Sequence, residues 1–275
     1  MTPTINKTPL KWAGSKARIM NELRQYLPAG QRLVEPFGGA CSVMMNTDYP
    51  KYLIADVNPD LINTLEMMAV ASTELIDRAG GMFDYDNVAD IYYSHRMDFN
   101  TTASDPLHRA AIFLYLNRHG YNGLCRYNQH GHFNVPFGNY KKPYFPEAEI
   151  DAFAKKAQHA TFICASYEET LDMVTTGDVI YCDPPYDGTF SSYHASRFSE
   201  DDQYRLASIL EHLADKGFPI IASNSDTPLV RSLYRDFAYH RVDVKRSIGA
   251  NTDSRKMPAA ELIITANVVI PERTA

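Results

Sequence analysis

The chain has 275 residues, of which 45% are hydrophobic and 22% are charged, the proportions of a folded protein with a substantial core. No apolar run approaches the roughly 18 residues of a membrane helix, and no charged start leads into an apolar segment, so we expect a cytoplasmic protein without a signal peptide. The four cysteines are scattered without a C-x-x-C pair, so we predict no metal site. Cys164 and Cys182 lie in predicted strands, where we expect buried free thiols.

The net charge of −6 is unevenly spread along the chain. From Pro106 to Pro146 there is no Asp or Glu but five Lys or Arg, so this stretch carries +5 and the remainder −11 (−6 − 5). The same stretch is rich in His, Tyr and Phe. A basic, aromatic segment inside an acidic protein predicts a surface that faces nucleic-acid phosphates; the alternative is a chance gap in acidic residues.

The first motif is the segment LKWAGSK at residues 10–16, which contains the only tryptophan of the chain, Trp12. A lone tryptophan is either a core residue or a ligand contact. The flanking lysines and the glycine leave both interpretations open.

A glycine turn follows the first predicted strand. Residues 33–35 form this strand, the turn lies at Gly38 and Gly39, and a helix is predicted from there through Asn46. A second predicted strand, residues 52–56, ends in Asp56. This arrangement is typical of a nucleoside site in which the acid accepts ribose hydroxyls. Because G-x-G-x-x-G is absent, the pattern favours a smaller adenosyl ligand over NAD.

Residues 57–145 are predicted to form an inserted, mainly helical lobe. Helical periodicity covers 58–79, with a break at Gly80-Gly81, and then 92–99 and 109–116. A β-hairpin is predicted at 126–134.

After the lobe, strands and helices alternate. The predicted strands are 161–164, 179–182, 219–223, 239–244 and 261–268, and the predicted helices are 200–216, with Ser199 as N-cap, and 226–234. The segments 187–198 and 247–258 are predicted to be mobile loops. The alternation predicts an α/β fold with a doubly wound, Rossmann-like sheet, mostly parallel with an antiparallel last strand. Residues 1–56 and 146–275 would form this domain.

The strand at 179–182 ends in Asp183-Pro184-Pro185-Tyr186. Two prolines lack backbone N–H groups and stop the strand, so a rigid turn presents its polar groups at the carboxyl edge of the sheet. These groups suit a planar nucleic-acid base that carries an exocyclic amine. Asp183 and the Pro184 carbonyl can each accept one hydrogen of the amine, and Tyr186 can stack on the face of the base. The alternative is a strand-ending turn with a surface tyrosine.

This tetrapeptide is the motif of amino-methyltransferases that modify adenine N6 or cytosine N4. The chain resembles the Dam-type DNA adenine-N6 methyltransferases from about Leu10 to Val268. The resemblance rests on LKWAGSK (10–16), LVEPFGGACSV (33–43), IADVNPDLI (54–62), FLYLNRHGYNGLCRYN (113–128), FNVPFGNYKKPYFPEAE (133–149) and VIYCDPPY (179–186). It implies S-adenosylmethionine as methyl donor, duplex DNA as partner, GATC as the target sequence, and flipping of the adenine out of the duplex. It also assigns the inserted lobe, residues 57–145, to target recognition.

The resemblance further assigns roles to individual residues. Catalytic roles fall on Asp183, Pro184 and Tyr186. Cofactor contacts fall on Trp12, Lys16, Phe37, Gly39, Asp56, Ser166, Tyr167 and Asp183. Contacts with the recognition sequence fall on Tyr121, Asn122, Leu124, Arg126 and Pro136, and phosphate contacts on Arg118, Asn128 and Lys141. Asn139 and Tyr140 are also expected to bind DNA. Among the sequence contacts, Arg126 is expected to read a guanine, because its planar fork suits the O6/N7 edge.

The chain departs from the family pattern at two positions. Cys41 stands at the last glycine of the F-x-G-x-G turn, and Asn139 stands where close relatives carry a basic residue. The first departure concerns the shape of the cofactor turn, and the second concerns discrimination of the outer base pair.

Other functions remain open at this point. The chain could methylate cytosine N4, RNA adenine, or a protein or small-molecule amine, or it could be a DNA-binding relative without activity. No Pro-Cys pair occurs, which argues against the cysteine-nucleophile route to cytosine C5. No obligate protein partner is expected.

Overall fold

The computed structural model describes residues 4–187, 198–245 and 258–269. These residues form one seven-stranded sheet in the order β3-β2-β1-β4-β5-β7-β6. The strands are β1 (Arg32–Glu35), β2 (Lys51–Asp56), β3 (Ala160–Cys164), β4 (Asp178–Cys182), β5 (Ile220–Ser225), β6 (Ala238–Lys245) and β7 (Pro258–Ala266). From β3 to β5 neighbouring strands are parallel, whereas β7 pairs antiparallel with both β5 and β6. The predicted α/β fold, with a mostly parallel sheet and an antiparallel last strand, is therefore confirmed.

The helices also follow the predicted alternation. They are η1 (Lys16–Arg18), α1 (Met20–Leu23), η2 (Arg24–Tyr26), η3 (Met44–Asn46), α2 (Pro59–Val70), α3 (Ser72–Tyr85), α4 (Ala89–Thr101), α5 (Pro106–His119), η4 (Tyr121–Gly123), α6 (Glu147–Ala157), α7 (Tyr167–Leu171), α8 (Glu200–Asp215) and α9 (Pro228–Leu233). Ser199 caps α8 as predicted, and its hydroxyl accepts from the Asp202 amide. The predicted mobile loops fall largely on residues 188–197 and 246–257, which lie outside the described part of the chain.

The sheet is covered on both faces, which explains why its central strands are apolar throughout. Successive residues of β4 point to opposite sides. Val179 and Tyr181 belong to the core on one face, with β1, β2, α2 and α6, and Ile180 and Cys182 belong to the core on the other, with α7 and α8. All five residues of β4 are buried.

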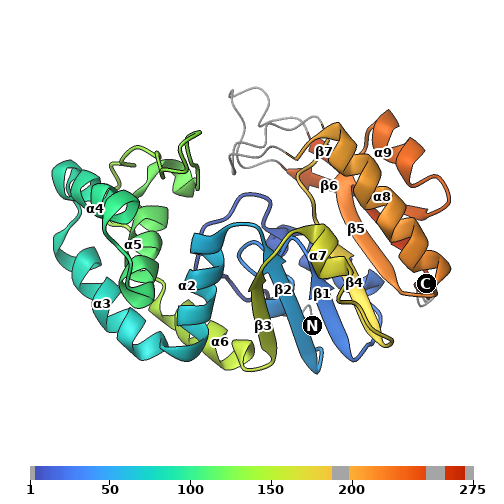
Figure 1. Cartoon of the computed structure of the whole chain (residues 1–275), viewed down its shortest axis with the longest axis horizontal. Helices are drawn as coiled ribbons and strands as arrows, with labels where there is room; N and C mark the ends of the chain where they lie inside the picture. Colours follow the sequence, from blue (N-terminus) through green and yellow to red (C-terminus); the bar gives the residue numbers. More distant parts are fainter. Residues whose placement is uncertain (1–3, 188–197, 246–257, 270–275) are drawn as a thin grey trace.

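The helical lobe of α3, α4 and α5 lies at one end of the molecule, beyond α2 and β3, and α8 and α9 lie at the other end (Figure 1). The lobe does not have a core of its own. Phe99 and Phe113 belong to the same buried cluster as Leu65 of α2 and Ile54 of β2. The helix α2 therefore packs on both the lobe and the sheet.

Two predictions about helices are wrong, one about the existence of a helix and one about the position of a break. The segment after the glycine turn forms only the single 3-10 turn η3 rather than a helix. The predicted break at Gly80-Gly81 instead occurs at Ala71, between α2 and α3. A Cβ at Gly80 would lie 3.8 Å from the Phe145 ring, an ordinary van der Waals distance, so the packing here does not require glycine.

Candidate active site

The order of the strands reverses between β1 and β4, which lie side by side at the centre of the sheet. Their carboxyl ends bring Glu35 and Asp183 to the same edge. In open α/β sheets, ligands bind at this switch point, outside the carboxyl ends of the strands. The predicted corner at residues 183–186 therefore stands where the fold favours a ligand.

Polar side chains behind the corner hold it in place. The Gln203 amide of α8 donates to the Pro185 carbonyl at 2.9 Å, and Asn224 of β5 in turn donates to Gln203 at 3.1 Å. Asp187, just after the corner, donates its N–H to Asn224 at 3.3 Å. Both Gln203 and Asn224 are buried. Sequence reasoning missed Gln203, although its place in line with Leu206 and Leu210 on the apolar face of α8 was a readable signal.

A lysine and two carboxylates meet at the corner. Lys16 Nζ lies 2.6 Å from Asp183 Oδ2 and 3.7 Å from Glu261 Oε1, and it also donates to the Gly14 carbonyl at 2.8 Å. The Tyr186 hydroxyl donates to Glu261, and Lys16 Nζ lies 4.9 Å from the centre of the Tyr186 ring. The structure thus brings together Lys16, Asp183 and Tyr186, which the sequence predicted, and adds Glu261, which it did not.

Burial controls the protonation of the carboxyl groups here. It raises the pKa of Asp183 to about 6, with Lys16 acting in the opposite direction and Glu261 raising it further. Burial, followed by the charge of Asp183, raises the pKa of Glu35 to about 8. Glu35 Oε1 is buried and has no hydrogen-bond partner among the described residues. Two carboxylates, Asp183 and Glu261, thus share one lysine, and the neighbouring Glu35 holds its proton at neutral pH.

The glycine turn closes onto the end of β2. The Gly39 N–H donates to Asp56 Oδ2 at 3.2 Å, and the Asn58 N–H donates to Asp56 Oδ1 at 2.9 Å. Gly39 has a φ of +48°, and a Cβ there would stand 2.9 Å from the Trp12 indole. Trp12, Gly39 and Asp56 therefore meet at one edge of the sheet, and only glycine leaves room for the indole at this place.

Cys41, at the end of the glycine turn, adopts a left-handed backbone conformation that glycine adopts more easily. Its φ is +60°, and its side chain is fully buried. Burial raises the pKa of its thiol well above the ordinary value, so the thiol stays neutral. The cysteine is accommodated in the left-handed region at this position.

The other predicted cofactor residues lie beside this turn. Phe37 stacks on Tyr167 with ring centres 5.6 Å apart, and the Phe198 ring packs edge-on against both. Ser166 is the N-cap of α7, and its hydroxyl accepts from the Glu169 N–H at 3.2 Å. The expectation that Cys164 is buried is wrong, because this thiol at the end of the edge strand β3 is exposed.

In the lobe, the predicted recognition residues lie on the loops after α5. The Tyr121 N–H donates to the Pro136 carbonyl at 2.9 Å, and the Asn122 N–H donates to the Tyr140 hydroxyl at 2.9 Å, so two distant segments form one surface. The exposed members of the predicted set are Tyr121, Asn122, Pro136, Asn139 and Lys141; the half-buried members are Leu124, Arg126, Asn128 and Tyr140. Sequence reasoning gave no role to Lys11, whose ammonium lies 4.5 Å from the centre of the Tyr140 ring.

In place of the predicted β-hairpin, residues 126–134 form a tight loop without regular strands, closed by one antiparallel bridge between Tyr127 and Phe133. The Asn134 N–H donates to the Arg126 carbonyl at 3.0 Å, and the Asn128 side chain accepts from the N–H groups of His130 and His132. Arg126 Nε donates to the Asn134 side chain at 2.7 Å, which orients the guanidinium.

The predicted phosphate contact would require Arg118 to be exposed to solvent, but the structure buries this side chain. It is 7% exposed, and its Nε donates to the Pro9 carbonyl at 3.0 Å. Its guanidinium links α5 to the segment before Trp12 through its hydrogen bonds to the Pro9 carbonyl.

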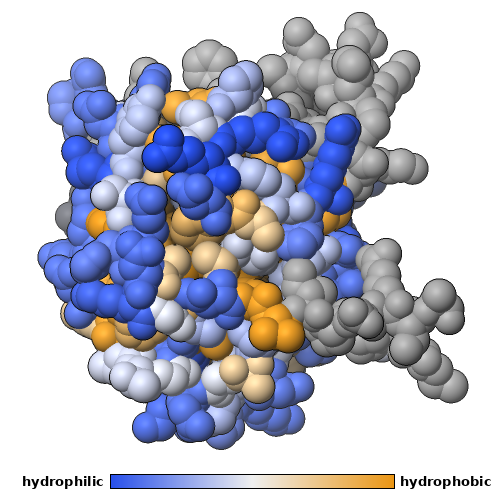
Figure 2. Space-filling view, turned by 90° about the vertical axis from the view of Figure 1, so that its right-hand side faces the viewer, coloured by the Kyte–Doolittle hydropathy of each residue, from blue (hydrophilic) through white to orange (hydrophobic). Residues whose placement is uncertain are grey.

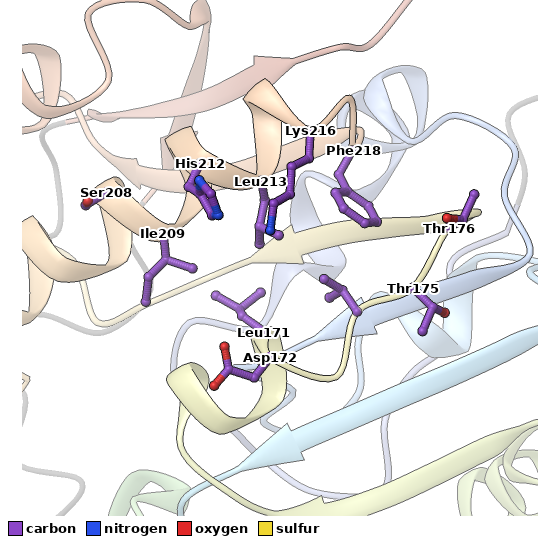
Figure 3. A pocket seen from close by; sticks show the side chains of 11 residues that line it. Leu171, Asp172, Thr175, Thr176, Ser208, Ile209, His212, Leu213, Lys216 and Phe218 are labelled. Atoms are coloured by element: carbon purple, nitrogen blue, oxygen red, sulfur yellow. The ribbon is translucent and has the colours of Figure 1, made fainter.

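A pocket lies away from this site. A cavity of about 690 Å³ is lined by residues of α7, the carboxyl half of α8 and the turn before β4, including Thr175, His212 and Phe218 (Figure 3). Thr175 and Phe218 precede β4 and β5, so this cavity is at the amino edge of the sheet, opposite Asp183. The end of the molecule that carries α8 and α9 is mostly hydrophilic with small apolar patches (Figure 2).

The fold and the site together define a class. An open α/β sheet with one reversed strand, an acid at the end of β2 and an Asp-Pro-Pro-Tyr corner at the switch point are the features of an amino-methyltransferase.

Comparison with known proteins gives the family. The sequence profile of the D12 class N6 adenine-specific DNA methyltransferases matches residues 12–248, and the chain belongs to this family. It is 59% identical over 257 residues to the Retron Ec67 DNA adenine methylase of Escherichia coli, covering 93% of this chain and 90% of that protein. It is 46% identical over 257 residues to the DNA adenine methylase of Escherichia coli K12, covering 91% and 92%, and 47% identical over 253 residues to that of Vibrio cholerae, covering 90% and 91%.

The predicted enzyme class, adenine-N6 DNA methyltransferase, is therefore confirmed, and DNA is its substrate. This decides against the alternatives of cytosine N4, RNA and non-nucleic-acid amines. In the described residues, no helix is long and apolar enough to cross a membrane.

Proposed function

We propose that the protein transfers a methyl group from S-adenosylmethionine to N6 of an adenine that has been flipped out of duplex DNA, within the sequence GATC. The observation that carries the proposal is the position of Asp183, which stands at the carboxyl end of β4, 2.6 Å from Lys16 and at the same edge as the Gly39–Asp56 turn. The relatives named as DNA adenine methylases support the choice of base.

The residues present fit the donor. S-adenosylmethionine, when bound, supplies an electrophilic methyl group on a positively charged sulfur. Asp56 suits the ribose hydroxyls, and the close approach of Trp12 to Gly39 offers an aromatic wall for the adenine of the donor. The two carboxylates around the single ammonium of Lys16 leave one surplus negative charge, which suits the cationic part of the donor.

The target amine is held and oriented by the corner. A base inside a stacked duplex cannot reach the donor, so extrusion at a cost of a few kcal/mol is required. Asp183 and the Pro184 carbonyl each accept one hydrogen of N6, which turns the nitrogen lone pair out of conjugation, and Tyr186 stacks on the ring. The methyl group passes directly to N6, so catalysis is mainly alignment and electrostatics.

A proton must then leave N6. Asp183 suits this step, because its buried carboxyl has a pKa of about 6 and holds a proton better than an exposed aspartate does. The carboxylate that orients the amine thus also receives its proton.

Recognition of the sequence would rest on the loops of the lobe. Arg126, oriented by Asn134, presents a planar fork that suits the O6/N7 edge of guanine. Lys141, on the segment after Tyr140, is exposed and suits a phosphate. The roles of Tyr121, Asn122 and Asn139 rest on their exposure on the same surface.

The test is methylation of duplex DNA by Asp183 variants. Asp183→Ala and Asp183→Asn should abolish the transfer of labelled methyl groups while leaving DNA affinity largely intact, since the only part of the DNA that Asp183 would contact is the extruded base. Asp215→Ala, at the exposed end of α8, is the matched control and should keep full activity. Full activity in the Asp183 variants would end the proposal. Cleavage of the product by methylation-sensitive nucleases identifies the modified sequence.

A further inference from the structure

Glu261 is a buried carboxylate on an otherwise apolar strand. It lies on β7 opposite Ser225 of β5 and is 8% exposed, whereas the next three residues, 262–264, are fully buried and aliphatic. An ionised carboxylate is retained in such a place only when charged or hydrogen-bonding groups meet it. Neither the motifs nor the family resemblance singled it out.

The groups that meet Glu261 belong to the site. The Tyr186 hydroxyl donates to Oε1, so the ring is anchored at its far end. Burial, together with the charges of Asp183 and Glu261, raises the pKa of Tyr186 well above its ordinary value, so the hydroxyl remains a donor at neutral pH. Glu261 thus fixes the tilt of the ring that is to stack on the base.

Lys16 lies between two carboxylates. Its ammonium is 2.6 Å from Asp183 and 3.7 Å from Glu261, so Asp183 holds it more closely in the absence of substrate. An adenine amine that approaches Asp183 has to compete with this ammonium for the carboxylate. A short movement of the Lys16 ammonium toward Glu261 would give it a second partner. The buried ammonium would then keep a counter-charge when the amine takes its place at Asp183.

We propose that Glu261 is a positioning residue of the adenine pocket, which fixes the Tyr186 ring through its hydroxyl and holds Lys16 when the adenine amine engages Asp183. The inference rests on the proposed function, since it assumes that Asp183 and Tyr186 hold the target base. It assigns to β7, the one antiparallel strand, a direct part in the site.

The proposal predicts a change in pH dependence. Asp183 is faced by charged and titratable groups from several elements: Lys16 of η1, Glu35 of β1, Tyr181 of β4, Tyr186 of the corner and Glu261 of β7. The charge of Glu261 is one of the causes that raise the pKa of Asp183. Asp183 must be ionised to accept the amine hydrogen, so activity falls as the pH drops through this pKa. In Glu261→Gln the pKa is lower, and the acid limb of kcat/KM should move to lower pH.

The experiment compares Glu261→Ala, Glu261→Gln and Tyr186→Phe. Glu261→Ala should lower kcat about tenfold or more, with a smaller change in the affinity for the donor, which the fluorescence of Trp12 as sole tryptophan can follow. The loss in the double variant Glu261→Ala/Tyr186→Phe should be smaller than the product of the two single losses, because both remove the same hydrogen bond. Thr265→Ala, buried on the same face of β7 but bonded to His240, is the control for a merely structural effect and should keep its kcat.

Two outcomes would overturn the inference. One is a folded Glu261→Ala variant whose kcat is within about twofold of the parent. The other is an acid limb that stays in place in Glu261→Gln. If either occurs while Asp183→Ala remains inactive, only the role of Glu261 fails; if Asp183→Ala is also active, the proposed function fails with it.

Discussion

Glu35 shows at the residue scale how the site works against the stability of the fold. Its carboxyl ends β1, is 2% exposed, and has one oxygen without a hydrogen-bond partner among the described residues. Burial and the neighbouring Asp183 raise its pKa from 4.5 to about 8. The folded protein therefore binds a proton that the unfolded chain releases over most of the neutral range.

This proton makes stability depend on pH in a definite direction. From about pH 4.5 to about pH 8 the folded state holds the proton and the unfolded state does not, so the free energy of unfolding falls as the pH rises through this window, by up to about 1.4 kcal/mol per pH unit. Asp183, whose pKa is raised to about 6, adds to the fall at the acid end. Glu35→Gln should flatten the dependence and be more stable than the parent at pH 8.

Urea unfolding of both proteins between pH 5 and pH 8 measures this effect. Glu211→Gln, on the exposed side of α8, serves as the control and should keep the slope of the parent. If Glu35→Gln is less stable than the parent at pH 8 and has the same slope, the carboxyl is ionised and held by a group that the structure does not reveal.

The place of a single residue in the fold could be predicted where its signal was local. Asp183, Pro184 and Tyr186 adjoin a buried strand, and Asp56 ends another, so position along the chain fixed their place at the edge. The partners of these residues could not be read in the same way. Glu261 meets Tyr186 from 75 residues further along the chain, because β7 inserts between β5 and β6.

At the scale of elements, α2 depends on its first turn. Asn58 caps it, accepting from the N–H groups of Asp60 at 3.0 Å and Leu61 at 3.1 Å, with Pro59 at the first helical position. Asn58 is buried, and its amide nitrogen lies 3.7 Å from Cys125 Sγ in the lobe. One residue thus joins the start of α2, Asp56 at the end of β2 and the lobe.

Asn58→Ala should lower the free energy of unfolding by about 1–2 kcal/mol, because it removes the cap and leaves two N–H groups buried without an acceptor. Glu66→Ala, exposed on the same helix, should change it by less than about 0.5 kcal/mol. Urea titration of the two variants beside the parent gives both numbers. Equal losses in the two would mean that the cap contributes nothing measurable.

Element boundaries were predicted less well than element types, and the reasons are physical. Gly80 and Gly81 lower helix propensity, yet α3 continues through them to Tyr85, with Leu75 and Ala79 buried on its packed face. The turn after Gly39 looked helical because it is apolar, but its residues are buried on all sides around η3 rather than on one face. Packing across the molecule decided both cases.

At the scale of the whole molecule, the basic stretch is less basic toward solvent than its sequence suggests. Arg109 Nε lies 2.6 Å from Asp60 Oδ1, and Arg118 is buried against the Pro9 carbonyl. Two of the five positive charges are therefore used inside the fold. The exposed cations of the stretch are Lys141 and Lys142, on the segment that follows the loops after α5, and Arg126 is half-buried.

This distribution makes a prediction for DNA binding. If Lys141 and Lys142 each neutralise one phosphate, the double variant Lys141→Ala/Lys142→Ala should bind duplex DNA more weakly, and the slope of log K against log salt should become shallower by about 1.8, since each phosphate contact contributes about 0.9. Lys51→Ala/Lys155→Ala removes the same charge from exposed positions outside the lobe and should leave the slope of the parent. Fluorescence anisotropy with a labelled duplex at several salt concentrations measures all three slopes. Equal slopes in the two double variants would mean that Lys141 and Lys142 contribute no more to phosphate binding than lysines elsewhere on the protein. The lobe would then lose its assignment as the side that faces the phosphates.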